Sequence, residues 1–169
     1  MKPMTISLII SVSLFTLAMA YPSGSEERGN YSILVLQYRG ALDKPIGPVI
    51  ISDSKTKAER YRYTGLNIVE ADFASVHVVP DSLLEKLIAE TESGKVIAQP
   101  KDMDDPMFSF VAATVITPQR RKTFLYEKQS AISFLDHLQK YCQDREALRS
   151  ALSYFQDRVR PLVLEEGGE

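Results

Sequence analysis

The clearest extended pattern of the chain lies in residues 108–126, with the sequence FSFVAATVITPQRRKTFLY. Both sides of residues 108–117 are largely apolar, as in a strand that is covered on two faces or lies inside a sheet. A proline and two arginines interrupt the run, and alternation resumes over residues 122–126. The pattern predicts an antiparallel hairpin with a basic tip, and we expect the sheet to be built around this hairpin.

Four more segments before the hairpin read as extended chain. Residues 31–39 are apolar on both sides, and residues 49–52 form a short apolar run. Both patterns are typical of buried strands. Residues 57–63 (KAERYRY) mix charged and aromatic side chains, which favours an exposed or edge strand. Residues 67–79 continue the alternation and predict a further extended region.

The helical period of 3.6 residues recurs in three segments. Residues 81–93 carry a leucine and isoleucine stripe with charged residues outside it, and Gly94 is a natural helix end. Residues 131–142 and 148–159 carry two more stripes, the second ending around Pro161. A brief strand over residues 95–98 is also compatible with the pattern.

The last two stripes are almost in phase, so one long helix stays open as an alternative to two. A single helix would place Arg145 in the apolar stripe. We therefore expect a break near Gln143 and Asp144, with Asp144 capping the last helix.

Strands followed by a hairpin and then helices favour an α+β fold with a mainly antiparallel sheet. One helix near residues 81–93 and two C-terminal helices should pack on one face or end of this sheet. We assign residues 31–164 to a single domain and residues 165–169 to a polar tail.

The N-terminus predicts a secretory signal peptide. Residues 1–20 contain Lys2, an uncharged apolar run and small residues around Ala20. The run is too short for a membrane span, which needs roughly 20 apolar residues. The alternatives are an uncleaved anchor or a buried first helix. Residues 21–30 are polar and read as a flexible tail.

Charge and cysteine content narrow the class of protein. Removing Lys2 with the leader takes the formal net charge from −2 to −3, which argues against a nucleic-acid binder. Cys142 is the only cysteine, so no intramolecular disulfide can form. A secreted domain without disulfides favours the bacterial periplasm or the medium around a bacterium.

Catalytic motifs are weak in this sequence. His77 and His137 are the only histidines, and no G-x-S-x-G elbow accompanies them. Five positions separate His137 from Cys142, which puts them on different helix faces. Too few cysteines and histidines are present for a structural zinc site, and no glycine-rich nucleotide motif occurs. We expect neither a metal nor a cofactor.

Two segments are candidates for binding a protein partner. The loop 40–48 is stiffened by glycines and prolines and carries Leu42, Lys44 and Ile46. Its apolar residues could instead cover the end of the sheet. The predicted hairpin tip carries three cations that could face an acidic partner, with Arg60 and Arg62 beside them, or simply be a solvated turn that discourages edge aggregation. These cations are Arg120, Arg121 and Lys122.

The sequence therefore favours a secreted or periplasmic, non-enzymatic protein-binding module. An inhibitor or an immunity-type partner of another envelope protein would fit this description. The alternatives are a small periplasmic hydrolase with an unrecognised site, and an oligomeric structural or assembly component of the envelope.

The predicted leader gives a first test. The chain recovered from the periplasm or medium of a bacterial host should begin at Tyr21 when its N-terminal peptide is read by mass spectrometry. Replacing Ala20 by tyrosine should block processing, because signal peptidase requires a small residue there. A wild-type chain that keeps residues 1–20 would contradict the prediction.

Overall fold

A computed structural model describes residues 32–40, 46–94 and 110–164 of the chain. In order, the elements are β1 (Ile33–Arg39), β2 (Val49–Ser52), α1 (Lys55–Gly65), α2 (Ile68–Phe73), β3 (Ser75–Val78), α3 (Asp81–Ser93), β4 (Phe110–Ile116), β5 (Arg121–Glu127), α4 (Lys128–Tyr141) and α5 (Glu146–Leu164). Several predictions fall outside the described residues, namely those on residues 1–31, Leu42, Lys44, residues 95–98 and residues 165–169.

The strands form one mixed sheet with the order β3-β2-β1-β4-β5. Three of its pairings are antiparallel, and only β2 and β3 run parallel. β1 is the central strand: Val35 lies opposite Ile50 of β2 and Thr114 of β4. The hairpin supplies β4 and β5, so its first strand lies inside the sheet and its second strand is an edge.

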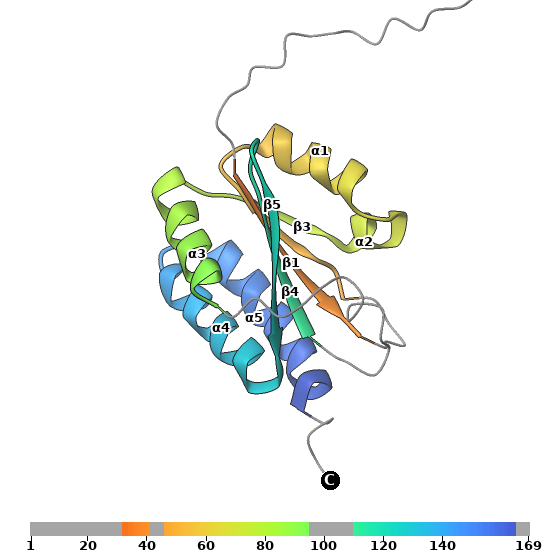
Figure 1. The fold of residues 1–169 in the computed structure, drawn as a ribbon, viewed down its shortest axis with the longest axis vertical. Helices are drawn as coiled ribbons and strands as arrows, with labels where there is room; N and C mark the ends of the chain where they lie inside the picture. The colour runs from red at the N-terminus through yellow and green to blue at the C-terminus, as the bar shows by residue number, and fades with distance from the viewer. Residues whose placement is uncertain (1–31, 41–45, 95–109, 165–169) are drawn as a thin grey trace, which may run out of the picture.

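The main core fills the space between the sheet and α3, α4 and α5, which all lie on one side of it (Figure 1). Alternate strand residues such as Leu34 and Leu36 point into this core, and both are fully buried. The helices contribute the stripes that the sequence predicted, including Leu84, Leu135 and Leu152. Burying such side chains is the dominant favourable term in folding, at about 1.5–3 kcal/mol each.

The opposite face of the sheet is covered by α1 and α2 (Figure 1). Ile33 and Val35 of β1 pack with Ile50 of β2 and with Ala58 of α1. The three helices predicted from the sequence do pack on one side of the sheet. The helical cover on the other side was not predicted, and β1 needs it because the strand is apolar on both faces.

Polar contacts attach α2 to the sheet and to α1. The side chain of Gln37 donates to Glu70 Oε1 at 3.2 Å, and Arg39 pairs with the same carboxylate at 3.3 Å. Arg62 Nε donates to the backbone carbonyl of Ala71 at 2.7 Å. The layer formed by α1 and α2 is therefore held on the sheet by few apolar residues, together with side-chain hydrogen bonds and an ion pair between elements.

The predicted fold class is confirmed: the protein is α+β, its sheet is mainly antiparallel, and its C-terminal helices pack on that sheet. α3 spans residues 81–93 as predicted, with Gly94 as its C-terminal cap. The C-terminal helical region is broken between Tyr141 and Glu146, so it forms two helices.

One strand prediction was wrong and another was right only in part, since residues 75–78 of the extended region predicted over 67–79 do form a strand, β3. Residues 57–63 belong to α1, and residues 68–73 form α2. The side chain of Ser54 caps α1 by accepting from Lys57 N. A capping box between Asn67 and Glu70 begins α2. Each helix buries only one small residue, which left no apolar stripe for the sequence pattern to reveal.

The ends of α5 also differ from expectation. The helix begins at Glu146, so Arg145 and not Asp144 immediately precedes it. It continues past Pro161 to Leu164. Pro161 is exposed, so water can reach the helix carbonyl that a proline leaves without a donor. Within the described ranges, no helix combines the length and apolar composition needed to cross a membrane.

Tyr126 joins the hairpin to two helices. Its hydroxyl donates to the Thr91 carbonyl of α3 at 2.6 Å, and its ring stacks on Phe134 of α4 at 3.9 Å. Burial is the main cause that raises its pKa to about 12, and the charge of Glu90 adds to the effect. The Tyr126 hydroxyl therefore keeps its proton at neutral pH and can donate its hydrogen bond.

Tyr126→Phe isolates the contribution of this hydroxyl, because the stacked ring remains. We expect the free energy of unfolding to fall by about 1 kcal/mol, since the Thr91 carbonyl keeps a second donor in Gly94 N at 3.3 Å. Tyr154→Phe is the matched control, because Tyr154 is exposed, and it should change stability by less than about 0.5 kcal/mol. Urea unfolding measures both variants, and equal stabilities would contradict the assignment.

Candidate functional site

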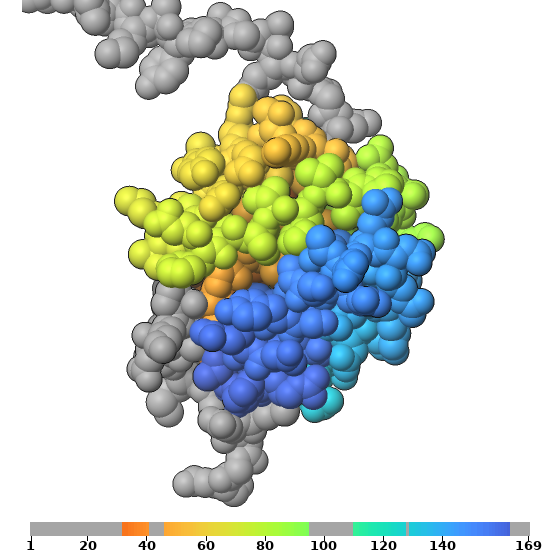
Figure 2. Space-filling model, turned by 180° about the vertical axis from the view of Figure 1, so that it is seen from behind, coloured from red at the N-terminus to blue at the C-terminus, as the bar shows by residue number. Residues whose placement is uncertain are grey.

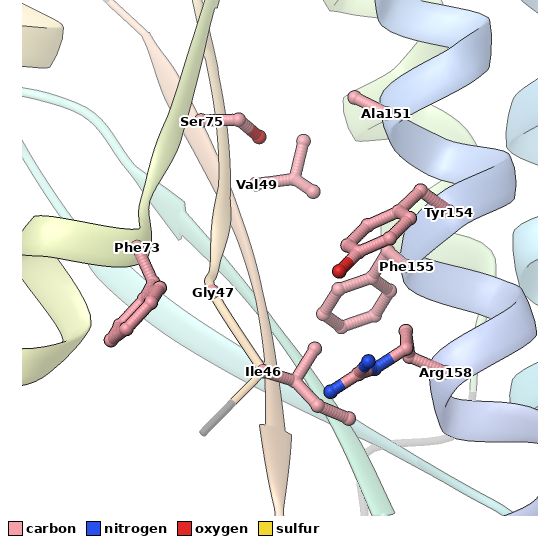
Figure 3. Close-up of a pocket in the computed structure, with 9 residues that line it drawn as sticks. All are labelled: Ile46, Gly47, Val49, Phe73, Ser75, Ala151, Tyr154, Phe155 and Arg158. Atoms are coloured by element: carbon pink, nitrogen blue, oxygen red, sulfur yellow. The ribbon is translucent and has the colours of Figure 1, made fainter. Parts of the chain in front are cut away.

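A pocket of about 460 Å³ lies between the β2–β3 side of the sheet and α5 (Figure 3). Pockets that bind small molecules are commonly of this size. Three separate segments line the pocket, with Ile46, Gly47 and Val49 from the start of β2, Phe73 and Ser75 around the α2–β3 junction, and Ala151, Tyr154, Phe155 and Arg158 from α5. From behind, orange atoms are visible between the yellow-green surface and the blue atoms of α5 (Figure 2).

Gly47 allows the first two segments to approach each other. A Cβ atom built on Gly47 would lie 1.9 Å from the backbone oxygen of Phe73, so no other residue fits without moving the chain. One residue later, the Pro48 carbonyl accepts from Ser75 N at 2.9 Å. The pocket wall thus begins at the point where the chain enters β2.

Among the described residues that line the pocket, Arg158 is the one cation and none is acidic. Arg158 extends from α5 toward Ile46 (Figure 3). Its guanidinium lies 5.9 Å from the centre of the Tyr154 ring, within the range of a cation–π contact. Among the described residues, no carboxylate pairs with Arg158. This cation is therefore available to a negatively charged group from outside the domain.

Four large apolar side chains are exposed on α2 and β3, the two elements whose junction lines part of the pocket. Ile68 is 82% exposed, Phe73 59% and Val69 52%, all on the six-residue helix α2. Val78 of β3 is 49% exposed. Single exposed apolar residues are ordinary, but four on two consecutive elements make these elements a candidate contact surface. We call Ile68, Val69, Phe73 and Val78 the α2–β3 face.

The two edges of the sheet differ in charge. β5 carries Arg121, Lys122 and Glu127, and charged side chains are a common protection against unwanted strand pairing. β3 has the sequence SVHV, which contains no aspartate, glutamate, lysine or arginine. Within the described part of the chain, no strand pairs with the outer side of β3.

The hydrogen bonds of β3 show which backbone groups face outward. Ser75 N donates to Pro48 O and Val79 N to Ser52 O, both at 2.9 Å. In a parallel pair, alternate residues direct both backbone groups to the same neighbour. Val76 and Val78 therefore direct their amides and carbonyls away from β2, toward the open edge.

The three predicted cations of the hairpin tip contact different parts of their own domain. Arg120 forms an ion pair with Glu92 of α3. Arg121 lies over the Tyr61 ring of α1 at 5.9 Å, and Lys122 lies over Phe124 at 4.8 Å. The tip therefore spans between the two helical layers.

Of the other predicted binding residues, Ile46 lines the pocket and Arg62 does not. Ile46 lines the pocket and also packs against the main core, so it covers the sheet as well as borders the site. Arg62, considered as a neighbour of the basic tip, bonds to Ala71 and pairs with Glu59 at 3.7 Å. Leu42 and Lys44 lie outside the described residues.

Sequence reasoning missed Ser75, Tyr154 and Arg158. One signal was present, because Ala151, Tyr154 and Arg158 recur at spacings of three and four and so share one face of α5. Nothing in the sequence places this face opposite Gly47 and Ser75. That opposition depends on the tertiary packing of α5.

The contacts of the described residues bring neither histidine to Cys142. His137 Nδ1 is 3.0 Å from Glu90 Oε1, and the Tyr141 hydroxyl is 3.3 Å from the other oxygen of Glu90. Burial raises the pKa of Cys142 to about 11, so its thiol stays protonated at neutral pH and is a poor nucleophile. The described residues contain no cluster of three acidic, histidine or cysteine side chains that could hold a metal.

Comparison with protein-family models, with curated proteins and with solved structures found no match to the chain. The function is therefore argued from the geometry of the α2–β3 face and the pocket.

His77 gives a pH test of the fold around β3. In the described chain its buried Nε2 atom has no hydrogen-bond partner, and burial lowers its pKa below the ordinary value of about 6.5. Just below pH 6.5 the unfolded chain therefore binds more protons than the folded one. Stability should be fully present above that pH and decline as the pH falls toward the folded pKa.

His77→Leu should flatten this decline between about pH 7 and 5, measured by urea unfolding. His137→Gln is the control, because it removes the other histidine, whose side chain is 52% exposed, and should leave the decline in place. An unchanged pH profile in the His77 variant would refute the assignment.

Proposed function

We propose that the protein is a non-enzymatic binding module of the bacterial periplasm or medium, which holds an extended segment of another envelope protein at the open edge of β3. Strand addition of this kind supplies affinity through backbone hydrogen bonds, and neighbouring apolar surface supplies specificity. An inhibitor or immunity-type partner would act in this way.

The observation that carries the proposal is the uncharged outer edge of β3, bordered by exposed apolar residues of α2. Val76 and Val78 offer two amides and two carbonyls to an added strand, as deduced from the bonds of their neighbours. Ile68 and Phe73 would be covered by the partner's side chains. The charged side chains on β5 make that edge the poorer docking position.

Val78→Pro tests strand addition directly. Proline removes the outward amide of Val78 and leaves the bonds between β3 and β2 in place. Val78→Ala is the matched control, because it shortens the side chain but keeps the amide. The mature chain and both variants are immobilised and exposed to an envelope extract of the source organism, and the retained protein is identified and titrated.

The wild type and the alanine variant should retain the same partner, and the proline variant should bind it about tenfold more weakly. That factor corresponds to about 1.4 kcal/mol, the size expected for a lost hydrogen bond and its neighbours. Equal binding by all three chains would falsify strand addition at β3. Recovery of a second copy of this chain, confirmed by mass measurements, would favour the oligomeric alternative instead.

A further inference from the structure

The pocket beside α5 combines an apolar floor with a small number of polar groups. Val49 and Phe155 belong to the buried core, and Ile46, Phe73 and Ala151 are the other apolar side chains of the lining. Arg158 and the hydroxyls of Tyr154 and Ser75 are its polar side-chain groups among the described residues, and none of them has a hydrogen-bond or ion-pair partner in the described chain. Apolar walls with a few converging polar groups are the usual form of a small-molecule site.

The charge of the side chains that line the pocket determines whether an anionic or a cationic ligand binds more strongly. The described residues that border the pocket include one guanidinium and no carboxylate, so an anion gains an ion pair with Arg158 and a cation is repelled by it. Arginine binds a carboxylate through two parallel hydrogen bonds, which are shorter and stronger than neutral ones. The side chain of Tyr154 reaches into the same space from α5 and that of Ser75 from β3 (Figure 3).

We propose that this pocket binds a free amphiphilic monocarboxylate, with its carboxylate on Arg158 and its apolar chain against Ile46 and Ala151, over the floor formed by Val49 and Phe155. The cation–π contact with Tyr154 holds the guanidinium at the rim before the ligand arrives. The apolar part of the ligand replaces water over the floor of the pocket, which supplies the non-directional part of the affinity.

Octanoate is a suitable probe, with octanol and octylamine as matched neutral and cationic ligands. Calorimetric titration of the full mature chain near pH 7 should show one saturable octanoate site. Octanol should bind at least about tenfold more weakly, and octylamine more weakly still. Equal binding of octanoate and octanol would overturn the proposal, because the carboxylate would then contribute nothing.

Two arginine variants on the same helix locate the site. Arg158→Met should weaken octanoate binding about tenfold and leave octanol binding unchanged. Arg149→Met is the control, because Arg149 lies on α5 outside this pocket, and it should bind octanoate like the wild type. If both variants behave alike, Arg158 is not the carboxylate partner and the proposal fails.

Two further measurements separate a free ligand from a protein segment. Ala151→Phe should fill the pocket and abolish the binding of both octanoate and octanol, whereas undiminished binding would place the site elsewhere. A tetrapeptide with a free C-terminal leucine should bind more weakly than octanoate. Tighter, Arg158-dependent peptide binding would overturn the proposal in favour of a chain terminus. The Val78→Pro variant should bind octanoate normally, so the two proposals fail independently.

Discussion

The structure depends on the burial of both faces of the central strand β1. Its residues Ile33, Leu34, Val35 and Leu36 are each no more than 2% exposed, and they alternate between two opposite sides of the sheet. Such a strand is stable only when each side is covered. One cover is the large layer of α3, α4 and α5, and the other is the smaller layer of α1 and α2. The two edges of β1 are hydrogen-bonded to β2 and β4, which makes β1 the middle strand of the sheet.

The same sheet has two edges of opposite character. At β5, Arg121 and Lys122 surround the edge with charge, and they also lie over aromatic rings of α1 and β5 itself. At β3, the exposed residue is Val78 and the neighbouring helix exposes Ile68. Charge at an edge opposes the addition of another strand, and its absence removes that protection. This difference is the physical basis for placing a protein partner at β3.

The pocket lies where the two helical layers approach the same end of the sheet. α2 ends at Phe73 on one layer, and α5 presents Tyr154 and Arg158 from the other. Between them, Gly47 lets the chain pass against the Phe73 carbonyl as it enters β2. The α2–β3 face and the pocket therefore share Phe73 but offer different chemistry. The face offers backbone groups and apolar side chains, and the pocket offers a cation that pairs with no carboxylate of the described chain.

The sequence by itself determined the elements whose apolar residues repeat with a regular period. Short apolar runs indicated β1 and β2, and the interrupted apolar pattern of residues 108–126 indicated the hairpin. The 3.6-residue stripes indicated α3, α4 and α5, and Arg145 in the stripe indicated the break between the last two. α1 and α2 escaped this reasoning because their only fully buried residues are Ala58 and Ala71. Their capping residues, Ser54 and Asn67, were the local signals that a closer reading could have used.

Only the tertiary structure decided which residues form the site. Ile46, Ser75 and Arg158 lie far apart in the chain, and they share a pocket because β2 and β3 pair in parallel and α5 crosses that side of the sheet. The open edge of β3 likewise follows from the strand order and not from its own sequence. Periodicity records which face of an element is buried, but not which other element buries it. The positions of elements relative to one another therefore had to come from the packed structure.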